Sequence, residues 1–493
     1  MKVHRSTTAA TLLFASHAIA NNNPLTPDKL EADIRTEELQ NVLWNLNHIA
    51  SNNGGNRAFG EPGFKASVDF ILERAQTRFG DHFDTTVQPF NHTYDKTLEI
   101  KVTGPESEDV FVVSPQYNPP TPTPDGVTAA LVDTPVDDER GSACFADQWE
   151  GIDVEGKLAL IKRGVCAVAD KSTLAKERGA LGVILWDTEG GNNIVVPTLG
   201  ADSIGHTVPI GIIPLEVGEA WKERVNAGEE VVVSLLVDAI SETRETWNII
   251  AETKQGDPNN IVMVGAHLDS VQAGPGVNDD GSGTATLLEI LTAVRQYDHF
   301  PNKIRFAWWG AEESGLVGSL YYTSHLPEED INKIKYYFNY DMTGSPFPVF
   351  SVEGSDNAGI GTQLLGDYLV AQGKNITNEG LGGGSDHVGF VELGIPTAAI
   401  HTGAGAPYDP CYHQACDTLD NIDWDALTVN AKSAARALAT LALSLEGVPP
   451  RSQTSENLRT RRGVAKNFRR WSALAAKASQ GHTCAHKGEK VRV

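Results

Sequence analysis

The chain has 493 residues and a formal net charge of −24, with 64 Asp and Glu against 40 Lys and Arg. This length is enough for two or three domains with their own cores, so the chain does not need disulfide bonds in order to fold. An acidic protein is repelled by nucleic acid and by anionic membranes, and we expect neither as a partner. The charge is unevenly placed, because residues 451–493 hold eleven Lys and Arg against Glu456 and Glu489.

The N-terminus has the pattern of a secretory signal. Lys2 and Arg5 precede an apolar run that ends in Ala18-Ile19-Ala20. Small residues in this arrangement mark a cleavage site, and we predict cleavage after Ala20. The run is too short to span a bilayer and no other stretch is long and apolar enough, so we predict no membrane span. The sequence therefore predicts a secreted protein, with the lumen of a vacuole as the alternative destination.

Two further features suit the secretory pathway. Asn91 and Asn375 each begin an Asn-x-Thr triplet, which makes them candidate glycosylation sites. Four of the five cysteines fall into two pairs that are candidate disulfides in an oxidising compartment: Cys144–Cys166 and Cys411–Cys416. Cys484 is left alone in the basic tail.

The first half of the chain contains two kinds of sequence pattern. Residues 28–46 and 64–78 have helical patterns, and residues 87–102 have the pattern of one or two strands. From about Gly104 a Pro-rich stretch is followed by short β-like runs, namely 158–162, 183–186 and 231–237. This change predicts a strand-rich module, residues 106–239, inserted into another domain.

Beyond Glu245 the pattern changes to an alternation of strand, loop and helix. The buried-strand candidates are 261–265, 304–309, 336–340 and 397–401, and a helix over 424–446 closes the fold. Such alternation predicts an α/β domain with a mixed, mostly parallel central sheet flanked by helices. We predict that this domain is discontinuous and comprises residues 21–105 and 240–447. Residues 448–493 are predicted to be a disordered or processed basic tail.

Side chains that can bind a metal or transfer a proton follow the predicted strands. His267 and Asp269 come after strand 261–265, and Asp279 and Asp280 lie in the Gly-rich loop before the next helix. In an open α/β sheet, ligands bind outside the carboxyl ends of the strands, which is where these four residues fall.

Three further segments add to this group. Glu312 and Glu313 follow strand 304–309, Asp341 follows strand 336–340, and His413 lies in the loop bounded by Cys411 and Cys416. Any one of these residues alone is most simply a solvated loop residue, but four such groups at four strand ends indicate a metal site.

The donor set indicates which metal and how it acts. Imidazoles and carboxylates without a required thiolate suit zinc. Two adjacent glutamates do not easily bind one ion together, so we expect one of Glu312 and Glu313 to be a ligand and the other a general base. Asp269 is expected to accept the second ring N–H of His267 and so to orient that ligand.

The motifs around these residues resemble those of secreted bacterial and fungal zinc aminopeptidases of the leucine aminopeptidase/aminopeptidase Y family. They are HLDS at 267–270, NDDGSG at 278–283, WWGAEESGLVGS at 308–319, NYDMTGS at 339–345, GGSDHVGF at 383–390 and CYHQACD at 411–417. Residues 52–70 are similar to the first catalytic helix of that family. The segment GKLALIKRGVC at 156–166 resembles the protease-associated (PA) domain that several members carry as an insert. The resemblance spans residues 28–447 and implies the zinc exopeptidase fold with an inserted α+β PA domain.

The resemblance also implies a role for each site residue. Two zinc ions per subunit are implied, one bound by His267, Asp279 and Asp341 and the other by Asp279, Glu313 and His413, with Asp279 as the bridge. Glu312 becomes the general base that takes a proton from the attacking water and returns it to the leaving amine. Tyr412 is placed to donate to the developing oxyanion. The Asp279-Asp280 peptide is expected to be cis.

The implied activity is that of a secreted dizinc metallo-aminopeptidase, a hydrolase that removes N-terminal leucine or other apolar residues from peptides with a free N-terminus. Acidic groups such as Glu312 and Asp341 can hold an α-ammonium, whereas these motifs contain no arginine cluster for a terminal carboxylate. Gly384 stands where bacterial members of the family have an arginine before Ser-Asp. We expect a monomer.

Two other readings are compatible with parts of this pattern. One is an enzyme of the same fold with a different reaction, such as glutaminyl cyclisation, but those relatives bind a single zinc and lack the full ligand set. The other is a non-catalytic receptor or binding module that joins a PA domain to a catalytically inactive peptidase fold. Such proteins lose ligands, whereas all five ligand positions are filled in this sequence.

Overall fold

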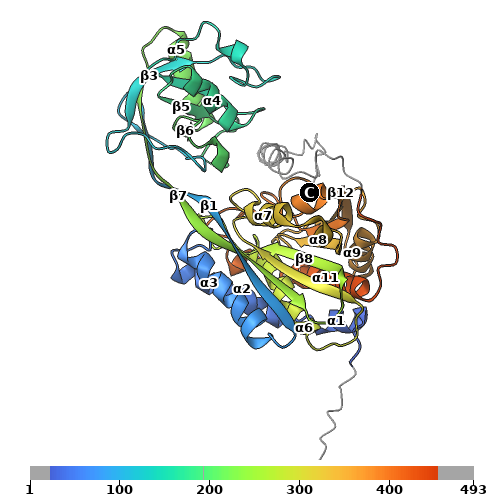
Figure 1. Cartoon of the computed structure of the whole chain (residues 1–493). Helices are drawn as coiled ribbons and strands as arrows, with labels where there is room; N and C mark the ends of the chain where they lie inside the picture. Colours follow the sequence, from blue (N-terminus) through green and yellow to red (C-terminus); the bar gives the residue numbers. More distant parts are fainter. Residues whose placement is uncertain (1–22, 193, 453–493) are drawn as a thin grey trace, which may run out of the picture.

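The computed structural model describes residues 23–192 and 194–452 (Figure 1). The predicted signal, Cys484 and the tail beyond residue 452 lie outside the described residues. Within the described part, no helix is long and apolar enough to cross a membrane.

The strands form one continuous hydrogen-bonded sheet of 13 strands. They are β1 (Phe83–Thr103), β2 (Asp109–Val110), β3 (Val127–Asp133), β4 (Leu158–Lys162), β5 (Gly182–Trp186), β6 (Ile210–Ile213), β7 (Val232–Thr253), β8 (Asp257–His267), β9 (Asn302–Trp309), β10 (Ile334–Tyr340), β11 (Phe350–Gly354), β12 (Ile376–Gly380) and β13 (Thr397–His401). The main path runs β12-β11-β13-β10-β8-β9-β7-β3-β4-β5-β6, with β1 paired to β7 and β2.

The helices flank this sheet. They are α1 (Pro27–Asp33), α2 (Thr36–Asn52), α3 (Pro62–Leu72), α4 (Val168–Glu177), α5 (Leu215–Asn226), α6 (Gly281–Val294), α7 (Val317–His325), α8 (Glu328–Ile331), α9 (Ile360–Ala371), α10 (Val388–Glu392) and α11 (Trp424–Leu443). A π-helical turn, Glu73–Arg78, continues α3.

The centre of the larger part is parallel and buried on both faces. Strand β8 pairs in parallel with β9 and β10, and β10 pairs in parallel with β13, while β7 and β11 add antiparallel neighbours. Alternate residues of β8 face opposite cores: Val262 and Val264 pack in a cluster with α2, α6, α9 and α11, whereas Ile261 and Met263 pack in a cluster with α7, α8 and α10. The prediction of a mixed, mostly parallel sheet flanked by helices is confirmed.

The inserted module stands apart from the larger part and is joined to it by β1 and β7 (Figure 1). Its parallel strands β3, β4, β5 and β6 have a core on each face, one containing residues of α4 and the other containing Trp221 of α5. The strands predicted at 158–162 and 183–186 are present as β4 and β5.

The connection between the two parts differs in detail from the predicted pattern. Residues 87–102 belong to a single strand, β1, and the run predicted at 231–237 forms the start of the longer strand β7, which begins at Val232. The two strands pair antiparallel from Phe83 opposite Thr253 to Thr103 opposite Ser234. The predicted module boundary at residues 239 and 240 therefore lies inside a continuous strand.

The helix predicted over 28–46 is two helices, α1 and α2. Ile34, between them, is extended and buried, and the backbone N–H of Arg35 donates to the carboxylate of Glu289 on α6 at 3.3 Å. The break has a tertiary cause, because the N–H group that would continue the first helix is satisfied by a side chain far away in the sequence.

Candidate metal centre

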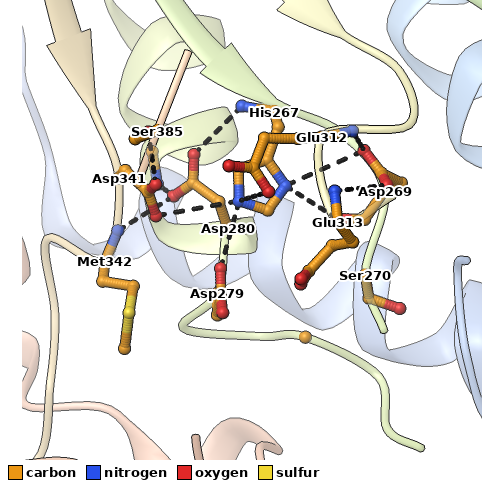
Figure 2. Close-up of polar contacts among 12 residues, drawn as sticks. His267, Asp269, Ser270, Asp279, Asp280, Glu312, Glu313, Asp341, Met342 and Ser385 are labelled. Carbon is orange, nitrogen blue, oxygen red and sulfur yellow. Dashed lines mark hydrogen bonds and ion pairs between the residues drawn. The ribbon is translucent and has the colours of Figure 1, made fainter. Parts of the chain in front are cut away.

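Neighbouring strands bring the predicted ligands to one edge of the sheet. His267 is the last residue of β8, Glu312 and Glu313 follow β9, and Asp341 follows β10. Because these three strands are parallel neighbours, their carboxyl ends lie side by side. Asp279 reaches the same place from the loop that precedes α6, and Figure 2 shows its carboxylate below the His267 ring.

One candidate metal subsite consists of His267, Asp279 and Asp341, whose potential ligand atoms all lie within 4.8 Å of one another. The Nε2 atom of His267 is 3.1 Å from Oδ1 of Asp279 and 3.7 Å from Oδ1 of Asp341. The side chain of His267 is only 1% exposed. A buried imidazole with two carboxylates is a donor set that zinc accepts.

The second candidate subsite consists of Asp279, Glu313 and His413, again with ligand atoms within 4.8 Å of one another. The Nε2 atom of His413 is 3.2 Å from Oδ2 of Asp279 and 3.1 Å from Oε2 of Glu313. Asp279 therefore presents one carboxylate oxygen to each subsite. All five predicted ligands are brought together, in the two groups that the sequence resemblance implies.

Buried carboxylate oxygens without a hydrogen-bond partner in the two subsites favour the binding of a cation. Oδ1 of Asp341 and Oε1 of Glu313 are buried and have no hydrogen-bond partner among the described residues. An unsatisfied buried carboxylate oxygen is costly, and a bound cation removes that cost. The residues present therefore fit a pair of zinc ions.

The two histidines have raised pKa values in the metal-free protein. Burial lowers the pKa of His267, but the neighbouring carboxylates, led by Glu312, outweigh it and hold this pKa well above its ordinary value. Desolvation also opposes the charge on His413, whose side chain is 39% exposed, yet Glu313 and Asp279 raise its pKa to about 10. The centre thus attracts positive charge, from protons or from a metal ion.

Glu312 is close to the first subsite without belonging to either ligand group. Its Oε2 atom is 3.9 Å from Nε2 of His267, and its side chain is 8% exposed. Burial raises the pKa of Glu312 well above the ordinary value of a carboxyl group, against the opposing effect of His267. A buried carboxylate with a raised pKa, placed beside a ligand group, has the properties of a general base.

Asp269 contacts the His267 ring as predicted, through its backbone oxygen. The Nδ1 atom of His267 is 3.0 Å from the backbone oxygen of Asp269, whereas the Asp269 carboxylate is 3.9 Å away. That carboxylate instead accepts the backbone N–H groups of Glu312 at 3.0 Å and of Glu313 at 3.3 Å (Figure 2). The predicted contact of the His267 ring with Asp269 is therefore present, but its acceptor is the backbone oxygen, while the carboxylate turns toward the loop after β9.

Two supporting residues were contained in the motifs but had no predicted role. Asp280 caps α6 by accepting the N–H of Gly283 at 2.8 Å, and it also accepts the N–H of His267 at 3.2 Å. Ser385 donates to Oδ2 of Asp341 at 2.6 Å (Figure 2). These contacts tie the ligands of the first subsite to α6 and to the segment before α10.

Tyr412 precedes His413, and the two rings stack with their centroids 3.8 Å apart. Burial raises the pKa of Tyr412 well above its ordinary value, and the nearby carboxylates of Asp279 and Glu313 add to this effect. The phenol therefore keeps its proton at neutral pH and remains a hydrogen-bond donor.

Several remaining predicted features are present in the described residues. The Cys144–Cys166 and Cys411–Cys416 disulfides are formed, and the Asp279-Asp280 peptide is cis. Asn91 and Asn375 are exposed, as acceptors of a glycan must be. Gly384 is also exposed, and a Cβ atom added there would meet no atom within 4 Å.

Comparisons with known proteins agree with this geometry. Residues 248–438 match the model of Peptidase family M28, and residues 127–221 match that of the PA domain. Aminopeptidase Y of Saccharomyces cerevisiae is 34% identical over 450 residues, which cover 86% of this chain and 82% of the yeast protein.

Solved structures show the same fold over most of the chain. An aminopeptidase from Aneurinibacillus sp. strain AM-1 superposes with a TM-score of 0.72 at 28% identity and covers 87% of this chain and 98% of its own. A zinc aminopeptidase from Bacillus subtilis gives a TM-score of 0.61 at 25% identity, with 88% and 98% covered. The chain therefore belongs to peptidase family M28 and carries a PA domain.

Proposed function

We propose that this protein is a metallo-aminopeptidase that removes N-terminal residues from peptides with the help of two zinc ions. The observation that carries the proposal is the Asp279 carboxylate, which has one oxygen 3.1 Å from His267 and the other 3.2 Å from His413. A carboxylate shared in this way belongs to a two-metal site rather than to two separate ones. The similar aminopeptidases of yeast and of two bacteria support the reaction class.

His267, Asp279 and Asp341 would hold one ion, and Asp279, Glu313 and His413 would hold the other. When bound, the two ions would supply Lewis acidity that activates a water molecule and polarises the scissile carbonyl. Glu312 takes a proton from the attacking water and returns it to the leaving amine. The raised pKa of Glu312 suits this role, since it strengthens the carboxylate as a base.

Tyr412 is the candidate donor to the oxyanion that develops on the carbonyl oxygen. Its hydroxyl keeps its proton because burial raises its pKa. A donor that is already in place costs little reorganisation during the reaction, and this is why such groups are effective.

Acidic side chains select the end of the substrate that enters the centre. Glu312 and Asp341 can hold the α-ammonium of a free N-terminus, and the chain as a whole is strongly acidic. A preference for leucine or another apolar residue is proposed from the sequence resemblance. We further propose that the protein is secreted after cleavage behind Ala20, glycosylated at Asn91 and Asn375, and monomeric.

Zinc content and hydrolysis of leucine p-nitroanilide, measured together on the purified protein, test the proposal. The wild type should bind two zinc ions and hydrolyse this substrate, but it should leave the N-acetylated substrate intact. E312Q should keep both ions and lose about 10²–10⁴-fold in kcat, the usual contribution of a general base. E313Q, which alters the neighbouring glutamate, should lose zinc as well as activity.

A zinc-free protein that stays inert when zinc is supplied would refute the proposal and favour a binding module with a dead peptidase fold. One zinc per chain together with cyclisation of N-terminal glutamine would favour the glutaminyl cyclase alternative.

A further inference from the structure

The loop that carries His413 is held at both ends by buried carboxylates outside the ligand set. The Cys411–Cys416 disulfide closes this loop, and Asp409 and Asp417 flank it. Asp409 is fully buried and Asp417 is 2% exposed, whereas the side chain of His413 is 39% exposed. The position of this exposed ligand therefore depends on what fixes the ends of its loop.

Asp417 binds the backbone of the segment that contains the proposed bridging ligand. Its Oδ2 atom accepts the N–H of Asp279 at 3.1 Å, and its Oδ1 atom accepts the N–H of Asn278 at 2.9 Å. Its backbone oxygen accepts the N–H of Val277 at 3.1 Å. Three consecutive backbone N–H groups of the loop before α6 thus donate hydrogen bonds to Asp417.

Two amide side chains join Asp417 to Asp409. The Nδ2 group of Asn421 donates to Oδ1 of Asp409 at 2.9 Å and to Oδ1 of Asp417 at 3.1 Å. The side chain of Asn278 donates to Oδ2 of Asp409 at 2.7 Å. All four side chains are buried. We call Asn278, Asp409, Asp417 and Asn421 the loop clamp.

We infer that Asp417 is a positioning residue for the second metal subsite, where it sets Oδ2 of Asp279 against Nε2 of His413. The inference rests on the proposed function, because it concerns the zinc ion that those two residues share. The first subsite has a different support, since His267 ends a central strand and Asp341 follows another. In the second subsite His413 lies on a loop, and Asp417 is the residue that bonds the backbone of Asp279 and lies one position beyond the disulfide that closes the His413 loop.

The inference predicts a larger effect on the second ion than on the first. Loss of the Asp417 contacts should mainly lower the affinity of the second subsite, because the first subsite shares only Asp279 with it and is otherwise held by strand ends. Residues that orient metal ligands typically contribute a factor of about 10–100 in metal affinity or activity, and we expect an effect of that size.

D417N is the test variant and D409N is the matched control. In D417N an amide N–H₂ replaces an acceptor oxygen, so one backbone N–H at residues 278 and 279 must face a donor in either orientation of the amide. In D409N the same clash arises with the side chain of Asn278, or with that of Asn421 and the N–H of Cys411, but not with the backbone of Asp279. Each variant changes one buried carboxylate of the loop clamp. They differ because Asp417 accepts the backbone N–H of the proposed bridging ligand, Asp279, whereas Asp409 does not.

Stepwise zinc binding to the metal-free full-length protein is measured by calorimetry, and thermal unfolding is recorded for each zinc-loaded variant. We expect D417N to weaken the second ion about 10–100-fold and the first ion by a smaller factor. D409N, which leaves the backbone of Asp279 in place, should weaken the second ion less than D417N does, even where its thermal stability falls. Saturating zinc should restore the kcat of D417N, a rescue that general misfolding would not allow.

Wild-type affinity for both ions in D417N, or equal weakening in D417N and D409N, would overturn the inference. If D417N does not fold, D417A replaces it, because alanine removes both carboxylate acceptors from the N–H groups of Asn278 and Asp279 without placing a donor against them. A normal second ion in D417A would then count against the inference. A wild type that binds fewer than two ions would instead refute the proposed function, so the two failures are distinguishable.

Discussion

The carboxylate of Asp269 accepts the backbone N–H of Glu312 at 3.0 Å and also that of the next residue, Glu313, at 3.3 Å. One buried side chain therefore orients the proposed general base and a proposed metal ligand through their backbones. The same residue contacts His267 through its backbone oxygen. Asp269 thus connects the end of β8 with the loop after β9.

From this relationship we expect D269N to lower kcat about 10–100-fold, as is typical for residues that support a metal centre. The new amide group presents a donor to one of the two N–H groups, and the loop that carries Glu312 must shift. Steady-state kinetics with leucine p-nitroanilide, together with zinc content, measures the effect. An unchanged kcat in a fully zinc-loaded D269N would contradict it.

The proposed oxyanion donor is tested by Y412F. Phenylalanine keeps the aromatic ring and its stacking on His413, so the change removes only the hydroxyl. We expect a loss of about 10²–10³-fold in kcat, the range seen when one oxyanion donor is removed, with little change in KM. A similar kcat for Y412F and wild type would show that this hydroxyl only packs in its loop.

Zinc binding at pH 7 should release protons. The pKa of His413 is raised to about 10 and that of His267 is also raised. We therefore infer that both rings are in the charged imidazolium form, with a proton on each nitrogen, in the metal-free protein at pH 7. Zinc binds the neutral ring, and each released proton makes the affinity fall about tenfold for every unit by which the pH is lowered.

Calorimetric titrations in buffers of different ionisation enthalpy count the released protons. The apparent binding enthalpy should vary with the buffer in the sense of net proton release. An enthalpy that is independent of the buffer would exclude the protonated state inferred for the two histidines.

Glu289 predicts a pH dependence of stability away from the metal centre. This residue of α6 is 2% exposed, and burial raises its pKa to about 7 from an ordinary value of 4.5. Between these values the unfolded chain is ionised while the folded protein keeps the proton. The contribution of protonated Glu289 to the free energy of unfolding is therefore fully present below pH 4.5. It is lost as the pH rises to about 7.

E289Q removes this titration and retains an acceptor for the N–H of Arg35. We expect E289Q to gain stability over the wild type as the pH rises from 4.5 to 7, by at most about 3 kcal/mol. Urea unfolding of both zinc-loaded proteins at pH 5 and pH 8 measures the difference. A difference that is the same at both pH values would show that Glu289 is ionised in the folded state.

Much of the fold and of the candidate site could be predicted from local patterns. Buried apolar runs identify β8, β9, β10 and β13, and polar residues just after such runs identify the ligands. The convergence of His267, Glu313 and Asp341 follows from parallel pairing alone, because parallel neighbours have their carboxyl ends at one edge. The grouping of the ligands around Asp279 came from the sequence resemblance.

The features that sequence patterns did not predict all depend on contacts between distant residues. The break between α1 and α2 places the N–H of Arg35 on Glu289, and the carboxylate of Asp269 turns to the loop after β9. The bonds of Asp417 to Asn278 and Asp279 join segments more than 130 residues apart. No local spacing encodes such pairs.

By itself, then, the sequence determined the buried strands and the candidate ligands that follow them, since burial and polarity vary with short periods that a sequence displays directly. The tertiary structure alone decided which backbone groups Asp269 and Asp417 hold, and how β1 and β7 carry the PA domain. These outcomes depend on which buried N–H group finds which oxygen, and that choice is made only when distant segments pack together.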